Sequence, residues 1–210
     1  KIVGMNPAPN LVLVGPMGAG KSALGRRLAE RFGLRFVDLD QAIEAAAGRT
    51  IPAIFASDGE AAFRALERAQ LAALLTGDGM VLATGGGAVL DADNRAAMRA
   101  RGFVVHLHVD LDTQLQRLAR DRKRPLLAVP DREAVLRRLS EERAPLYAEV
   151  ADLRFVSRAG SLGDACGRLS VLLRDRWTPA LQAASGRADA HAHLRAADLP
   201  SPTSPQEPAP

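Results

Sequence analysis

Cysteine and long apolar runs are scarce in this chain of 210 residues, and their scarcity excludes two broad classes of protein. The single cysteine, Cys166, can form no disulfide within the chain, which favours a reducing compartment. The longest uncharged stretch in the middle of the chain, residues 79–90, is too short to cross a bilayer, which takes about 20 apolar residues. No secretory signal is recognisable. We therefore expect a cytoplasmic protein that makes no membrane contact.

Aromatic and lysine side chains are also few, and this bears on the kind of ligand. The net charge of +4 and the pI of about 9.9 would by themselves suggest nucleic-acid binding. However, only 4% of the residues are aromatic, which leaves little for base stacking. Nearly all the basic residues are arginine, which suits two-pronged binding of phosphates and carboxylates. The composition therefore favours a small anionic ligand and no nucleic acid.

Short apolar runs alternate with longer amphipathic stretches, a pattern typical of a doubly wound α/β domain. We expect an N-terminal extension (1–7), one domain (8–177) and a disordered tail rich in Pro, Ala and Ser (178–210). Within the domain the expected strands are 11–14, 35–37, 80–83, 103–107 and 154–156. The expected helices are 21–32, two segments within 41–75 that break near 57–59, and then 92–101, 111–119, 132–143 and 162–176.

Residues 15–22, with the sequence GPMGAGKS, match the phosphate-binding pattern G-x-x-x-x-G-K-[ST] between an expected strand and an expected helix. Backbone N–H groups of such a loop surround phosphate oxygens, and the helix N-terminus adds partial positive charge. Lys21 is expected at the β- and γ-phosphates, and Ser22 at a Mg²⁺ ion. A glycine turn that merely joins strand to helix would not require the lysine and serine. The expected nucleotide-binding residues are Gly18, Ala19, Gly20, Lys21, Ser22 and Ala23.

Two carboxylates, Asp38 and Asp40, follow the second expected strand. Residues i and i+2 of an extended chain point the same way, here at the sheet edge where α/β proteins bind ligands. One could serve the metal, while the other accepts hydrogen bonds from a hydroxylated substrate. The alternative is a helix cap, with Asp40 capping the helix from Gln41 onward. The pair alone leaves both interpretations open.

Four further features have both a structural and a functional interpretation. Arg64 and Glu67 are either a surface ion pair or a pair in which Glu67 aims Arg64 at a substrate carboxylate. The three glycines of 85–87 exceed what a turn needs and suggest a ligand against the backbone. The basic segment 117–130 is either a lid or a solvated run of charge. Arg143 has a good structural explanation near a helix C-terminus.

The remaining polar and aromatic residues are expected to be structural. His106 and His108 lie two apart on one strand, and we favour ordinary strand residues over a metal pair because no third ligand is in view. Cys166 is expected to be a small buried side chain. Trp177 is expected to hold the last helix to the body of the domain.

Taken together, six blocks closely resemble shikimate kinase over residues 8–175: GPMGAGKS, FVDLD, FRALE, LATGGG, RDRKRPLL and ERAPLYAEVAD. The resemblance implies a P-loop NTPase fold of the nucleoside-monophosphate-kinase type, with a five-stranded parallel sheet flanked by helices and a lid. It also implies transfer of the ATP γ-phosphate to the 3-hydroxyl of shikimate, in chorismate and aromatic amino-acid biosynthesis. The implied ligands are ATP, shikimate and Mg²⁺, and we expect a monomer.

The resemblance also assigns roles to individual residues. The catalytic group consists of Lys21, Asp40 as the candidate base, and Arg124 of the lid. The residues assigned to the metal are Ser22 and Asp38. ATP is contacted by the P-loop residues, Arg117 and Arg124, and the substrate by Asp40, Arg64, Gly85, Gly86, Gly87 and Arg143.

Two positions depart from the family pattern. Ala23 replaces a threonine that often follows the P-loop serine, and Gly160 stands near a position where some relatives have a polar contact to adenine, so that contact is unassigned. Two other functions share part of this pattern: a P-loop kinase for another sugar acid such as gluconate, and an ATP-dependent binding module that acts through the tail. Retention of Arg64, Arg143 and the triple glycine argues against the first, and retention of the catalytic group against the second.

Overall fold

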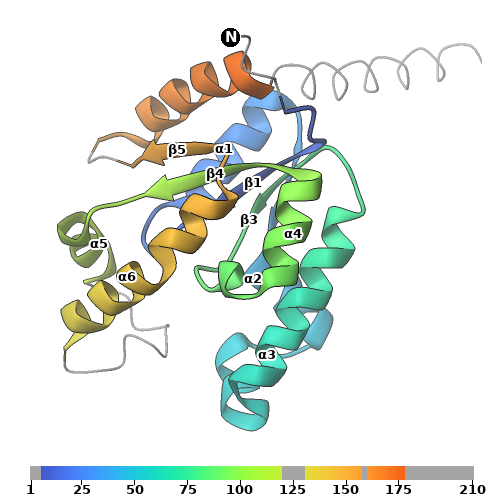
Figure 1. Cartoon of the computed structure of the whole chain (residues 1–210), viewed down its shortest axis with the longest axis vertical. Helices are drawn as coiled ribbons and strands as arrows, with labels where there is room; N and C mark the ends of the chain where they lie inside the picture. Colours follow the sequence, from blue (N-terminus) through green and yellow to red (C-terminus); the bar gives the residue numbers. More distant parts are fainter. Residues whose placement is uncertain (1–5, 120–130, 158–159, 178–210) are drawn as a thin grey trace, which may run out of the picture.

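Five parallel strands form one sheet at the centre of the molecule (Figure 1). The structure is a computed structural model that describes residues 6–119, 131–157 and 160–177. The strands lie in the order β2-β3-β1-β4-β5. Their bounds are β1 Asn10–Val14, β2 Arg35–Asp38, β3 Met80–Ala83, β4 Gly102–His108 and β5 Leu153–Val156. The predicted strands and the doubly wound α/β class are thereby confirmed.

The central strand β1 divides its side chains between two cores, one on each face of the sheet. Leu11 and Leu13 pack with α1 and the C-terminal helix, whereas Val12 and Val14 pack on the other face with α3, α4 and α6 (Figure 1). Successive residues of a strand point to opposite faces, so a run of four apolar residues fits a strand that is covered on both sides.

The helices are α1 Lys21–Phe32, α2 Leu39–Ala47, α3 Ile51–Leu75, α4 Ala92–Arg101, α5 Leu111–Leu118, α6 Arg132–Val150 and the C-terminal helix 162–177. A short 3-10 helix, η1 Ala88–Leu90, precedes α4.

Two helix boundaries differ from the prediction by more than two residues. The main break between residues 41 and 75 is at 48–50, where Gly48 ends α2 with φ 64° and Thr50 caps α3; the predicted break near 57–59 is a kink within α3 at Gly59, with φ 81°. The helix predicted to end at residue 143 continues to Val150 through Pro145. One missing backbone hydrogen bond is tolerated there because Tyr147 and Val150 are buried against the sheet.

Trp177 joins the C-terminal helix to the body of the domain, as predicted. Its indole Nε1 donates to the Ala8 carbonyl at 2.7 Å, its ring stacks on Phe103 at 6.2 Å, and its side chain is fully buried. Cys166 on the same helix is buried as well, as expected. The expectations for 1–5 and for 178–210 concern residues outside the described part of the chain.

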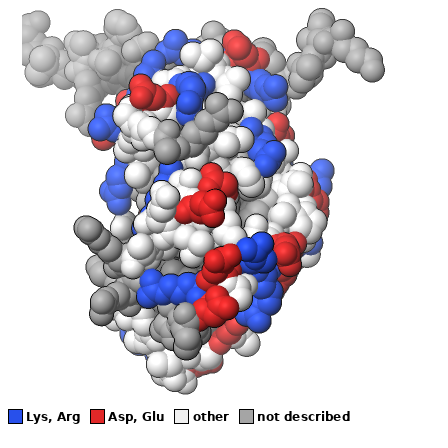
Figure 2. Space-filling model, turned by 90° about the vertical axis from the view of Figure 1, so that its left-hand side faces the viewer, with Lys and Arg blue, Asp and Glu red and all other residues white. Residues whose placement is uncertain are grey.

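The surface carries charges of both signs. On the face in Figure 2, acidic and basic side chains lie beside one another and form no continuous basic surface. None of the described helices combines the length and the apolar character that a membrane crossing requires.

Candidate active site

A cavity of about 380 Å³ lies at the carboxyl ends of the parallel strands, the edge at which α/β sheets bind ligands. The P-loop after β1, the β2–α2 junction and the glycine loop after β3 contribute to it, and α3 and α6 close it. Twelve predicted site residues line it: Gly18, Gly20, Lys21, Ser22, Ala23, Asp38, Asp40, Arg64, Gly85, Gly86, Gly87 and Arg143. Ala19 is buried beside them, and Arg124 falls outside the described residues.

The P-loop has the backbone that its glycines predict. Gly15, Gly18 and Gly20 all have positive φ, and a side chain at Gly15 would overlap the Leu107 carbonyl of β4. Lys21 is buried, and its Nζ donates to the carbonyl oxygens of Gly15 at 2.7 Å and Pro16 at 2.9 Å. The loop leads into the N-terminus of α1, whose N-cap Gly20 offers no side chain to the first backbone N–H groups, and this is the geometry of an anion site.

Ser22 and Asp38 meet at the start of α1. The Ser22 hydroxyl donates to Asp38 Oδ2 at 2.6 Å. A hydroxyl and a carboxylate side by side are oxygen ligands of the kind that Mg²⁺ prefers, so these two residues fit the metal that the sequence predicts. Among the described residues, no group of three or more His, Cys, Asp or Glu could hold an ion by itself.

Asp38 and Asp40 both line the cavity, but the prediction that they lie on one extended strand is wrong. Asp38 is the N-cap of α2: its Oδ1 accepts from the backbone N–H of Asp40 at 3.1 Å and of Gln41 at 3.4 Å. Asp40 therefore lies in the first helical turn and not in an extended strand. The helix cap interpretation also named the wrong residue. Because both aspartates stand near the start of the helix and aspartate is a favoured N-cap, local sequence did not distinguish them.

A buried carboxylate, Glu67, stands beside Asp40. A Cβ added to Gly85 would lie 2.9 Å from Asp40 Oδ1 and 3.2 Å from Glu67 Oε1, so both carboxylates face this glycine. Glu67 is 1% exposed, which excludes a surface ion pair, and its Oε1 has no hydrogen-bond partner among the described residues. Burial raises the pKa of Glu67; the Arg64 cation opposes the rise, and the Asp40 charge adds to it.

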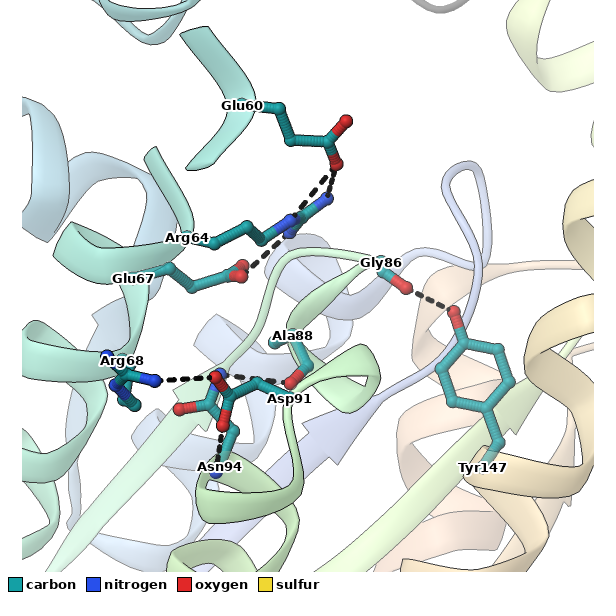
Figure 3. Close-up of polar contacts among 9 residues, drawn as sticks. All are labelled: Glu60, Arg64, Glu67, Arg68, Gly86, Ala88, Asp91, Asn94 and Tyr147. Atoms are coloured by element: carbon teal, nitrogen blue, oxygen red, sulfur yellow. Dashed lines mark hydrogen bonds and ion pairs between the residues drawn. The ribbon is translucent and has the colours of Figure 1, made fainter. Parts of the chain in front are cut away.

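Arg64 is held between two carboxylates of its own helix (Figure 3). Its guanidinium contacts Glu67 Oε2 at 2.7 Å and Glu60 Oε1 at 3.0 Å. Burial alone lowers the pKa of Arg64, but the charges of and hydrogen bonds to these two carboxylates outweigh burial and raise it. The side chain therefore remains a cation with a fixed direction.

Arg143 approaches the glycine loop from α6. It is buried, and its Nε has no hydrogen-bond partner within the described part of the chain. Its Nη1 lies 3.7 Å from the position that a Cβ on Gly86 would take, and the P-loop backbone lies 3.5 Å from the same point. A buried cation is costly unless an anion accompanies it. The side chain is thus suited to bind an anionic group beside Gly86.

The triple glycine is explained by crowding and not by unusual backbone angles. None of the three has positive φ. Gly85 is covered by carboxylates, and a Cβ on Gly87 would lie only 2.6 Å from both Nη1 and Nη2 of Arg64. That a ligand lies against this backbone stays a prediction.

Other predicted residues lie outside the cavity. Arg117 of α5 donates to the Gly18 carbonyl at 3.0 Å and to Ser157 Oγ at 3.1 Å, so it lies beside the P-loop. His106 and His108 make an edge-to-face ring contact at 5.9 Å. Burial is the main cause that lowers the pKa of His106 to about 4.

The sequence did not predict the apolar wall of the cavity. Ile51, Phe55 and Phe63 of α3 line it together with the polar groups, and the Arg64 guanidinium lies 5.2 Å from the centre of the Phe63 ring. Phe63 directly precedes Arg64, so the FRALE block contained one signal. Ile51 and Phe55 are spaced as any core-facing pair on a helix, and their pattern does not distinguish a cavity from a core.

The comparisons with known proteins agree with this geometry. The family model for shikimate kinase matches residues 17–166. A shikimate kinase from Xanthomonas oryzae pv. oryzae is 59% identical over 173 residues, which cover 82% of this chain and 96% of that protein. The structure of "Shikimate kinase from Acinetobacter baumannii in complex with shikimate" has a TM-score of 0.77 and 46% identity, covering 79% of this chain and 93% of that one. A gluconokinase from Sinorhizobium meliloti is similar in fold alone, with a TM-score of 0.52 and 17% identity over 88% of this chain and 99% of that one. The chain therefore belongs to the shikimate kinase family and is an ATP-dependent kinase.

Proposed function

We propose that the protein transfers the γ-phosphoryl group of ATP to the 3-hydroxyl of shikimate, giving shikimate 3-phosphate and ADP in chorismate biosynthesis. One observation carries the proposal: a single cavity joins a P-loop to Asp40 and to two arginines from different helices. The P-loop suits the phosphate donor, and the other three side chains suit an acceptor that has both hydroxyl groups and a carboxylate. The related Acinetobacter baumannii enzyme, solved with shikimate, supports this choice of acceptor.

On the donor side, catalysis is mainly positioning and stabilisation of charge, because the transition state of phosphoryl transfer is loose and highly anionic. The P-loop N–H groups and Lys21 bind the phosphates. Ser22 and Asp38 would hold Mg²⁺, which when bound neutralises charge on the β- and γ-phosphate oxygens. Arg124 is proposed from the sequence as a further cation, on a lid of about residues 117–130, and Arg117 as an adenine-side contact.

On the acceptor side, Arg64 and Arg143 bind the carboxylate together and so fix the rotation of the substrate. Glu67 holds Arg64 in its direction at 2.7 Å. Asp40 accepts a hydrogen bond from the reacting hydroxyl. Because carboxylates are weak bases, we expect Asp40 to orient the hydroxyl more than to deprotonate it early. Exclusion of water from the cavity protects the γ-phosphoryl group from hydrolysis.

We further infer that residues 8–177 form the catalytic domain, that the tail 178–210 is not needed for catalysis, and that the protein works as a monomer in the cytoplasm. Its ligands are small molecules and not nucleic acid or membrane. The reducing setting inferred from one cysteine supports the compartment.

ADP release from Mg-ATP, measured with and without shikimate, tests the proposed reaction. We expect release to rise steeply with shikimate and to stay at its basal level with gluconate, the control sugar acid. Release that responds to gluconate and not to shikimate would refute the proposal in favour of another sugar-acid kinase. Release indifferent to both acids would refute it as well.

A further inference from the structure

Tyr147 of α6 reaches across to the glycine loop, 61 residues away in the sequence. Its hydroxyl donates to the Gly86 carbonyl at 2.6 Å (Figure 3). The side chain is 3% exposed, and its ring stacks on His106 of β4 with centroids 4.8 Å apart. Burial raises the pKa of Tyr147 to about 12, although the Arg143 cation opposes the rise. The phenol is therefore a permanent hydrogen-bond donor under working conditions.

This hydrogen bond fixes the direction of a whole peptide unit. The Gly86 carbonyl and the Gly87 N–H belong to one planar trans peptide, so anchoring the oxygen toward α6 turns the N–H the opposite way. Consecutive glycines have more backbone freedom than any other residues, so such a loop needs fixed points. The carbonyls of Gly85 and Gly87 accept from the backbone N–H groups of Ala88 and Leu90 at 3.3 and 3.0 Å. The Gly86 carbonyl is instead held by a side chain.

The same hydrogen bond sets Arg143 against the loop. Arg143 lies four residues before Tyr147 on α6, and residues at i and i+4 share one face of a helix. Both side chains are buried on that face, and the Arg143 Nη1 lies 3.7 Å from the position that a Cβ on Gly86 would take. A shift of the Tyr147 contact would therefore move the guanidinium and the peptide relative to each other.

We infer that Tyr147 is a positioning residue for the acceptor carboxylate: its hydroxyl fixes the Gly86–Gly87 peptide beside Arg143, and the His106 ring fixes its phenol. This inference rests on the proposed function, because it concerns the carboxylate that Arg64 and Arg143 bind. The aromatic stack starts on β4, an interior strand that pairs with β1 and β5, so the fixed point is tied to the central sheet. Tyr147 acts through its neighbours and is not assigned a contact with the reacting atoms.

Tyr147→Phe tests the inference, because it keeps the stacked ring and removes only the hydroxyl. We expect the KM for shikimate to rise about tenfold while the KM for ATP changes less than about twofold, since one hydrogen bond on the acceptor side is lost. Ser170→Ala is the matched control: Ser170 is also buried and its hydroxyl also donates to a carbonyl at 2.6 Å, but it lies on the C-terminal helix, outside the cavity. That variant should leave both KM values unchanged.

The methyl ester of shikimate separates a positioning role from a general loss of packing. The ester lacks the anionic carboxylate, so the ratio of kcat/KM between the unaltered protein and Tyr147→Phe should fall toward one with this substrate. A ratio that stays as large as with shikimate would overturn the inference, and so would an equal rise in both KM values or an unchanged KM for shikimate.

A second variant keeps the inference testable if Tyr147→Phe does not fold. His106→Leu keeps the hydroxyl and removes the stacked ring, and it should raise the KM for shikimate by a smaller factor, with the KM for ATP again unchanged. An unchanged KM for shikimate in this variant would contradict the role of the stack.

Absence of shikimate-dependent ADP release by the unaltered protein would overturn the proposed function and the inference together. If the unaltered protein turns over shikimate normally and both variants keep its KM values, the inference about Tyr147 is overturned and the proposed function stands.

Discussion

Replacing Gly87 with alanine should weaken the acceptor site without disturbing the fold. Gly87 has φ −98° and ψ −4°, which alanine adopts freely, so the substitution introduces no backbone strain. The new Cβ would lie 2.6 Å from both Nη1 and Nη2 of Arg64, whereas ordinary contacts begin at 3.4 Å. The guanidinium must therefore retreat by about 0.8 Å.

The retreat has a predictable effect on binding because Arg64 has little freedom. Its contact with Glu67 at 2.7 Å would be stretched or broken, and its alignment with the substrate carboxylate would be lost. One hydrogen bond to a charged group contributes about 1.5–3 kcal/mol, which corresponds to a factor of about 10–150 in affinity. We expect the KM for shikimate to rise by a factor in this range and the KM for ATP to stay nearly constant.

Steady-state kinetics and calorimetric titration with shikimate measure this effect. Gly167→Ala is the matched control, because a Cβ at Gly167 of the C-terminal helix meets no atom within 4 Å. That variant should keep both KM values and gain a little stability from the better helix former. An unchanged KM for shikimate in Gly87→Ala, in a folded protein, would refute the assignment of Arg64 to the acceptor.

Three further substitutions test the catalytic carboxylate, the buried histidine and the C-terminal helix. Asp40→Asn should lower kcat by a factor of about 10²–10⁴ with ATP affinity retained, as measured by steady-state kinetics and nucleotide titration; normal turnover would refute the role of Asp40. His106→Gln should flatten the pH dependence of stability between pH 4 and 6.5. The native pKa of His106 is lowered to about 4 from 6.5, so the unfolded state binds more protons in this window. The contribution of His106 to the free energy of unfolding is then complete above pH 6.5 and falls by up to about 3 kcal/mol as the pH drops to 4. The same pH dependence of the unfolding free energy in the variant and the unaltered protein would contradict this cause. Trp177→Ala should cost about 3–5 kcal/mol in denaturant unfolding at pH 7, and a loss below 1 kcal/mol would show that the indole does not hold the last helix.

Features encoded by neighbouring residues were predictable from the sequence. The P-loop could be predicted because its glycines, lysine and serine are consecutive and their chemistry is local. The strands could be predicted because a parallel sheet that is covered on both faces requires short apolar runs such as Leu11 to Val14. The kink at Gly59 was indicated by its glycine in the same way.

Boundaries and contacts between distant residues were less predictable. Asp38 and Asp40 are equally good helix caps, so only the folded backbone decides that Asp38 is the cap. Pro145 argued for a helix end, but burial of Tyr147 outweighs one lost hydrogen bond. The approach of Glu67 to Asp40 across Gly85 depends on how α3 packs beside the sheet, which no local pattern encodes.

Identification of the product is the sharpest test of the proposed reaction, in which one cavity aligns a phosphate donor with one hydroxyl of a bound acid. The measurement is phosphorus and proton NMR of the mixture after the protein has consumed Mg-ATP in the presence of shikimate. We expect one phosphate ester, on the 3-hydroxyl, in an amount equal to the ADP formed. A phosphate on another hydroxyl, or ADP accompanied by inorganic phosphate with no ester, would contradict it.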